Sequence, residues 1–326
     1  MRLRTASLGV LLAPLVLGAA SSTSPAVARH EGGRNVVPYD DPHSRAKAAL
    51  LARINQDRRG AGLLPVAYST RAARAGDRFC RDSVEQDFHG HWDLDGRSPY
   101  LRWSLAGGID AHAENFASKT RSPGPLMEPL EEILLEAHAA FMAERPPADG
   151  HRRTILDPRW THVGIGAALS GGRFRMTEEF VDQVMAWVEL PSGPVPAGKE
   201  ADFAAKLPPG WNLLAVGIAW EPPPLPISRA EAGRRGSYTL PEPSKMLRPY
   251  APRGGMWSDG SRGDFAAPPT GGLFRLKLLL DRRPGSTWVM VYAGPGEVTG
   301  KPISAMTLAR IEGTGSVSGL GNLGIR

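Results

Sequence analysis

Residues 136–169 read EAHAAFMAERPPADGHRRTILDPRWTHVGIGAAL, and this stretch carries three successive structural signals. Apolar side chains recur at helical spacing from residue 130 onward, which predicts an amphipathic helix that the Pro146–Pro147 pair ends. A short helix is expected over residues 151–156, and the apolar run 163–168 is typical of a buried strand. This order predicts a domain of mixed α and β structure.

The flanking segments extend the same pattern. A helix is predicted from Ser44 to the turn at Gly60, and another from the N-cap pair Ser69–Thr70 to Glu85. The Gly171–Gly172 pair predicts a hairpin turn into a second strand. Helices and antiparallel strands therefore share one domain.

Four motifs follow one another through this region. They are Asn55 within LLARINQDRRGAGLLPV, His91 within HWDLDGRSPYLR, Glu114–Asn115 within HAENFA, and His151 within residues 136–169. Their order and character resemble the CAP superfamily, which comprises cysteine-rich secretory proteins, antigen five and plant pathogenesis-related proteins. The likeness is to a bacterial, SCP-like form without disulfides, and it covers roughly residues 44–185.

The resemblance implies an α-β-α sandwich with a cleft lined by two histidines and two acids. Matched motif by motif, these cleft-lining residues are His91, Glu114, Glu144 and His151. Two features depart from the family pattern: Ala113 replaces a usual glycine, and Glu144 lies closer to the second histidine than in eukaryotic members.

These residue types are suited to more than one kind of chemistry. His91 and His151 offer imidazole nitrogens for a divalent metal such as zinc, and neighbouring carboxylates can orient the rings. A histidine beside a carboxylate also suits a general base, and the same groups could simply hydrogen-bond one another. His89 is an alternative to His91, and His112 is expected to be exposed near the cleft. No catalytic residue is predicted.

The C-terminal half has a different composition. Proline and small residues dominate residues 189–209, which predicts a linker after a CAP domain at 44–188. Short strand-like runs separated by glycine and proline then predict a smaller β-sandwich over 210–313, followed by a flexible tail at 314–326. The predicted fold class is α+β.

The N-terminus has the features of an export signal. Arg2 and Arg4 precede an apolar run, and a small-residue site ends at Ala28, so residues 1–28 are predicted to be a signal peptide followed by a flexible lead-in at 29–43. No apolar stretch reaches the roughly 18 residues of a membrane span. Cys80 is the only cysteine, so the exported chain cannot form an internal disulfide, and we expect a buried thiol.

Composition and charge argue against nucleic acid as a partner. The formal net charge of +6 comes from arginines scattered along the chain, without a nucleic-acid-binding motif. The sequence therefore predicts a secreted protein, extracellular or periplasmic, that binds a divalent metal and a sterol, lipid or cell-envelope ligand in its cleft. A metal-assisted hydrolase of peptidase type and a purely structural or adhesive module remain the alternatives, and the oligomeric state is open.

Overall fold

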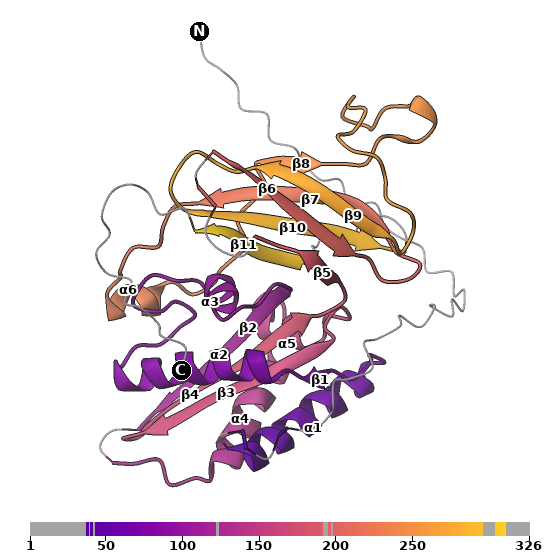
Figure 1. Cartoon of the computed structure of the whole chain (residues 1–326). Helices are drawn as coiled ribbons and strands as arrows, with labels where there is room; N and C mark the ends of the chain where they lie inside the picture. Colours follow the sequence, from indigo (N-terminus) through magenta and orange to yellow (C-terminus); the bar gives the residue numbers. More distant parts are fainter. Residues whose placement is uncertain are drawn as a thin grey trace.

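The computed structural model describes residues 37–38, 40–41, 43–121, 124–191, 195–196, 198–295 and 304–310. The predicted signal peptide, most of the lead-in and the predicted tail lie outside these residues. Within them, a region of helices and one sheet lies beside a second region built almost wholly of strands (Figure 1). None of the described helices is long and apolar enough to cross a membrane.

The first region contains five helices and four strands in the described chain. These are α1 (Ser44–Gly60), β1 (Ala67–Tyr68), α2 (Thr70–Glu85), α3 (Pro99–Leu105), β2 (Ala111–Thr120), α4 (Leu130–Ala143), α5 (Gly150–Ile155), β3 (His162–Ser170) and β4 (Arg173–Asp182). The strands form one sheet in the order β1-β3-β4-β2, in which β3 and β4 are the two arms of a hairpin.

Successive side chains of β4 point to opposite faces of the sheet, and this alternation explains which helices pack on each face. Phe174, Met176 and Phe180 point to the core shared with α1 and α4. The intervening residues face α2, where Thr177 lies against Cys80. Helices therefore cover both faces, which is the predicted α-β-α sandwich, and Cys80 is buried as predicted.

Glycines allow α2 to lie unusually close to β3. A Cβ atom added to Gly166 would lie 2.3 Å from the carbonyl carbon of Gly76, and one added to Gly164 would lie 2.1 Å from the backbone nitrogen of Ala73. The sequence Val-Gly-Ile-Gly thus places apolar side chains on one face of β3 and leaves the other face bare for the helix.

The second region is a β-sandwich. Its elements are β5 (Ala186–Glu189), β6 (Glu200–Lys206), β7 (Asn212–Glu221), α6 (Arg229–Arg234), β8 (Lys245–Leu247), a 3-10 turn (Pro252–Gly254), β9 (Leu273–Leu279), β10 (Ser286–Gly294) and β11 (Ser304–Arg310). The sheets have the orders β11-β10-β7-β8 and β5-β6-β9, and a common apolar core lies between them. The predicted fold class, an α-β-α sandwich followed by a β-sandwich, is confirmed.

The predicted linker needs a correction. Residues 200–206 within it form β6, the middle strand of its sheet, paired with β9 over its whole length. β5, at the end of the range assigned to the CAP domain, also belongs to the sandwich. The alternation of Ala201, Phe203 and Ala205, all buried, is the strand signal that the neighbouring prolines concealed.

The two regions share a core. Tyr100 and Leu101 of α3 lie in one cluster with Trp288 and Tyr292 of β10. The Tyr100 hydroxyl donates a hydrogen bond to Oε1 of Glu221 at 2.7 Å. Between β7 and β8, residues 222–244 leave the sandwich, cross the first region and return; we call this segment the strap.

Candidate functional site: a histidine and carboxylate cleft

The first half of the cleft pairs His91 with Glu114. His91 lies in the loop of residues 88–97 between α2 and α3, which we call the histidine loop, and Glu114 lies in β2. Nδ1 of His91 is 2.8 Å from Oε1 of Glu114. Glu114 is only 3% exposed, so this hydrogen bond fixes the orientation of the ring from inside the protein.

The second half pairs His151 with Glu144. Glu144 ends α4, and His151 lies in the first turn of α5 after the Pro146–Pro147 connection. Nδ1 of His151 is 2.5 Å from Oε1 of Glu144, whose Oε2 accepts the backbone N–H groups of His151 and Arg152 at 2.9 and 3.2 Å. One carboxylate therefore both orients the imidazole and holds the first turn of the helix.

The two histidines lie together although 60 positions separate them in the sequence. Their ring centroids are 6.2 Å apart, and the His151 ring stacks on Phe141 at 4.3 Å. In both rings Nδ1 is engaged by a carboxylate, so Nδ1 carries the proton in the neutral ring and Nε2 keeps its lone pair. The structure thus brings the four predicted cleft residues together as two histidine–carboxylate pairs, each bonded through Nδ1.

Arg102 stabilises the ionised form of Glu114 in the first pair. Its guanidinium lies over the Phe79 ring at 3.6 Å, donates to the backbone carbonyl of His91 at 2.6 Å and pairs with Oε2 of Glu114. Burial opposes ionisation of Glu114, but Arg102 and the hydrogen bond from His91 together lower the pKa of the Glu114 carboxyl. Glu114 is therefore a buried anion that keeps its partner imidazole in position.

Tyr238 of the strap is a cleft residue that sequence reasoning missed. Its ring meets the His91 ring edge-on, with centroids 5.0 Å apart. The Tyr238 hydroxyl accepts the N–H of Glu114 and donates to the carbonyl of Glu114 at 3.1 Å. Nothing in the local sequence around Tyr238 indicates this contact, because 124 positions separate it from its partner.

A further group of buried polar side chains is hydrogen-bonded to the second pair. His138 of α4 is fully buried, with Nδ1 2.7 Å from Glu178 and Nε2 3.0 Å from Asp57. Burial disfavours its charged form, but Glu178 and Asp57 outweigh this and raise the pKa of His138. Asn115 joins this group to the cleft, because its side-chain amide donates to Glu178 and to the carbonyl of His151. The two residues of the Glu-Asn motif therefore have different partners. Glu114 hydrogen-bonds His91, and Asn115 hydrogen-bonds Glu178 and the backbone carbonyl of His151.

Two other histidines, His112 and His89, have contacts outside the His91–His151 pair. His112 was expected to be exposed, but its side chain is 3% exposed, hydrogen-bonds Glu179 at 2.6 Å and stacks on Trp103. His89 lies against the strap: a Cβ atom on Gly233 would lie 2.7 Å from its Nε2. The histidine brought beside His151 is therefore His91.

Few side chains at this site could act as metal ligands. Within the described residues, no group of three or more histidine, cysteine or acidic side chains is arranged to hold a metal ion. His91 and His151 would supply two nitrogen ligands to a zinc or similar ion, and water or an oxygen of a bound molecule would have to complete the coordination.

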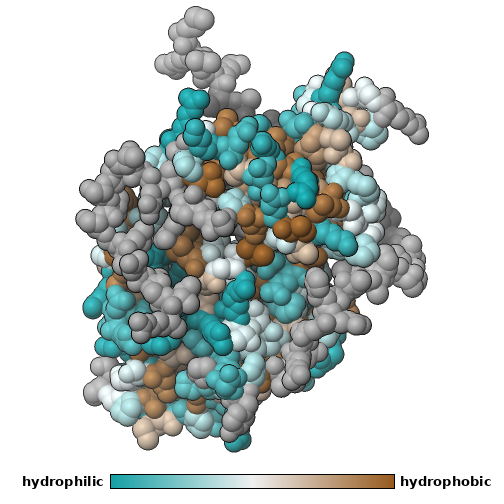
Figure 2. Space-filling model, in the orientation of Figure 1, coloured by the Kyte–Doolittle hydropathy of each residue, from teal (hydrophilic) through white to brown (hydrophobic). Residues whose placement is uncertain are grey.

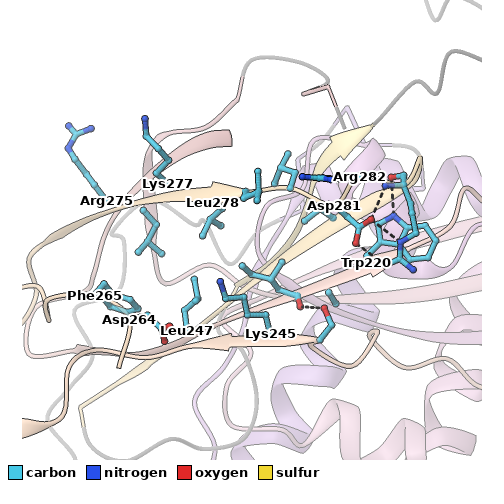
Figure 3. A pocket seen from close by; sticks show the side chains of 18 residues that line it. Trp220, Lys245, Leu247, Asp264, Phe265, Arg275, Lys277, Leu278, Asp281 and Arg282 are labelled. Atoms are coloured by element: carbon cyan, nitrogen blue, oxygen red, sulfur yellow. Dashed lines mark hydrogen bonds and ion pairs between the residues drawn. The ribbon is translucent and has the colours of Figure 1, made fainter. Parts of the chain in front are cut away.

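A separate cavity of about 860 Å³ lies in the β-sandwich (Figure 3). Its walls include Ile218, Leu247, Leu276 and Leu278, which come from strands of both sheets. Lys245, Arg282 and Arg283 also line it, with Asp264 and Asp281, whereas Arg275 and Lys277 point away from it in Figure 3 and pair with acids on the outer face of β9. On the face shown in Figure 2, hydrophobic residues gather over the sandwich among hydrophilic ones.

A protein-family model matches most of the first region of the chain. Residues 51–182 match the family model described as the cysteine-rich secretory protein family, CAP. The chain is 24% identical over 162 residues to YkwD of Bacillus subtilis, described as an uncharacterized protein, and the match spans 49% of this chain and 56% of that relative.

Solved structures give similar matches. An outer surface protein of Borrelia burgdorferi is 13% identical with a TM-score of 0.35, covering 43% of this chain and 95% of that one. An extracellular protein of Bacillus anthracis that contains an SCP domain is 16% identical with a TM-score of 0.33, covering 41% of this chain and 39% of that one. The family match over residues 51–182, together with the motifs, identifies the first region of this chain as a CAP domain.

Proposed function

We propose that this chain is an extracellular binding protein that holds a divalent metal ion, such as zinc, between His91 and His151. The observation that carries the proposal is that the two rings, with centroids 6.2 Å apart, both have Nδ1 bonded to a carboxylate. Each ring donates a hydrogen bond from Nδ1–H to a carboxylate, so that the neutral ring has an unprotonated Nε2, the arrangement that proteins use for metal-ligating histidines.

Each residue has a distinct part in this site. His91 and His151 would supply the nitrogen ligands, while Glu114 and Glu144 hold the rings and make them more basic. A bound ion would polarise an oxygen atom of a ligand placed in its open position. A serine or cysteine nucleophile would have to pair with Nε2 of one ring, whereas the described side-chain hydrogen bonds of these rings run from Nδ1 to Glu114 and Glu144.

Isothermal titration with zinc tests the site. The parent should bind one equivalent, and His91→Ala or His151→Ala should each weaken binding by about a hundredfold or more, because a nitrogen ligand is lost. Glu114→Gln should cost on the order of 10–100-fold, since it acts through His91.

His89→Ala is the matched control, since His89 lies in the same loop and faces the strap. It should bind zinc as the parent does. Equal affinity in the parent, His91→Ala and His151→Ala would contradict the proposed site. Lower thermal stability in these variants, with no zinc dependence in the parent, would show that the pairs are only structural.

A second candidate function is binding of an anionic amphiphile, and the sandwich cavity rather than the histidine cleft favours it. A volume of about 860 Å³ with leucine walls suits an acyl chain. Two cations of the lining, Lys245 and Arg282, have no ion pair with a described carboxylate and would suit an acidic head group.

Dansyl-labelled undecanoic acid is a direct probe of this cavity. The parent should show saturable binding at one site, and Leu276→Arg, which puts a charge on the apolar wall, should weaken it at least tenfold. Leu64→Arg on the exposed surface of the first region is the control and should bind as the parent does. Binding that is not saturable, or that survives Leu276→Arg in a folded protein, would exclude this site.

A further inference from the structure

The strap places one aromatic side chain inside the cleft. Tyr238 is held at both polar atoms of the Glu114 backbone and lies between His91 and Tyr100, whose ring centroids are 5.0 and 6.2 Å away. With Tyr238 in place, the side chain of His91 is 11% exposed, whereas that of His151 is 31% exposed. The two halves of the cleft therefore differ in access, and the strap lies over the less accessible half.

Three separate contacts anchor the strap on the histidine loop. Ala232 of α6 is fully buried against Phe79 and Phe88. The backbone N–H of Ile227 donates to the carbonyl of Leu94 at 2.9 Å, and the Arg235 guanidinium lies over the Trp92 ring at 4.8 Å. These contacts are few and local, and the segments 222–228 and 235–244 on either side of α6 contain no strand and no helix.

Glycines in the histidine loop make room for the strap. A Cβ atom on Gly96 would lie 2.1 Å from the carbonyl oxygen of Leu225, and one on Gly90 would lie 2.8 Å from that of Ala232. The loop that carries His91 is therefore shaped to lie against this segment of the second region.

We propose that the strap is a lid on the cleft and that Tyr238 is its specificity-determining residue, closing the His91 side to anything larger than a small ion until the strap lifts. The proposal deepens the proposed function by naming the element that controls access to the same cleft, but its geometric basis does not depend on a metal. Lifting the lid breaks the two hydrogen bonds of Tyr238 and uncovers its ring, Ala232 and the Trp92 face. The sandwich then controls what the CAP domain can bind.

Reaction of the histidines with diethyl pyrocarbonate tests the lid without metal. Mass spectrometry of the full chain measures carbethoxylation of each histidine, and His151 is the internal reference. In the parent, His91 should react much more slowly than His151. Tyr238→Ala should raise the His91 rate about tenfold toward that of His151, while Tyr238→Phe, which keeps the ring, should stay near the parent.

A glycine pair provides a second and independent variant. Gly96→Ala would push against Leu225 and should raise the His91 rate several-fold. Gly62→Ala is its matched control, because Gly62 has nearly the same φ, 75° against 76°, with no atom within 4 Å of the added Cβ. The control should leave the rate unchanged.

Two results would overturn the lid. One is a parent in which His91 reacts as fast as His151. The other is an unchanged His91 rate in both Tyr238→Ala and Gly96→Ala when circular dichroism shows that they are folded. If Tyr238→Ala does not fold, Gly96→Ala decides. Absence of zinc binding would refute the metal site and leave this result standing.

Discussion

Replacing Lys47 by Met is expected to destabilise the first region by about 3–5 kcal/mol, the usual cost of leaving a buried ion pair with one partner. Lys47 of α1 is fully buried, and its Nζ lies 2.5 Å from Asp41 and 2.7 Å from Asp77 of α2. The carboxylates also accept the Tyr68 hydroxyl and the Ala167 N–H. Burial raises the pKa of Asp77 although Lys47 opposes this, so the loss of Lys47 leaves two poorly solvated acids.

Urea denaturation followed by tryptophan fluorescence measures this effect. Lys119→Met is the control: Lys119 is an exposed lysine that also pairs with two acids, and its loss should leave the midpoint near that of the parent. The triple variant Lys47→Met, Asp41→Asn, Asp77→Asn should recover part of the loss, since no charge is then left buried. A single Lys47→Met variant as stable as the parent would contradict this account of the interior.

Stability should also fall as the pH rises from about 4 to about 8, because of two buried aspartates. Burial raises the pKa of Asp182 to about 8 despite the nearby charge of Arg159, and that of Asp110 to about 7. Asp182 is 2% exposed, and its Oδ1 has no hydrogen-bond partner in the described chain. Across this range the unfolded chain loses these protons while the folded chain keeps them, so the folded state becomes less favoured.

Asp182→Asn isolates that effect. The variant should match the parent near pH 4 and exceed its stability by on the order of 2–4 kcal/mol near pH 8.5, since an amide does not ionise. Denaturation curves at the two pH values measure the difference. Asp202→Asn, at an exposed position of β6, should change stability little at either pH. A difference between parent and Asp182→Asn that does not depend on pH would show that Asp182 is ionised in the folded protein.

Periodicity and caps predicted the first region well. Ser69, whose hydroxyl accepts the N–H of Ala72, caps α2 as its position in the sequence indicates. The helical spacing from residue 130 onward became α4, and the glycine pair 171–172 became the β3–β4 turn. These features are local, since each depends on residues within a few positions of one another.

The features that sequence reasoning missed depend on distant contacts. β6 is short and lies between prolines that concealed its alternation, and its pairing with β9 identifies it. Tyr238 lies in an irregular segment where no period or motif marks it. His138 shows only as one polar residue on an amphipathic helix, and its partners Asp57 and Glu178 come from two other elements. Burial of these groups is decided by the tertiary fold and not by local pattern.

We propose that His91 and His151 together hold a divalent ion. Crystals of the mature protein grown with zinc, with anomalous diffraction collected on both sides of the zinc absorption edge, test it most directly. The account predicts one anomalous peak between the two rings, within about 2.0–2.1 Å of Nε2 of each histidine, while each Nδ1 keeps its carboxylate. A zinc-saturated crystal with no peak there, or with Nε2 of either ring turned away from the ion, would contradict it.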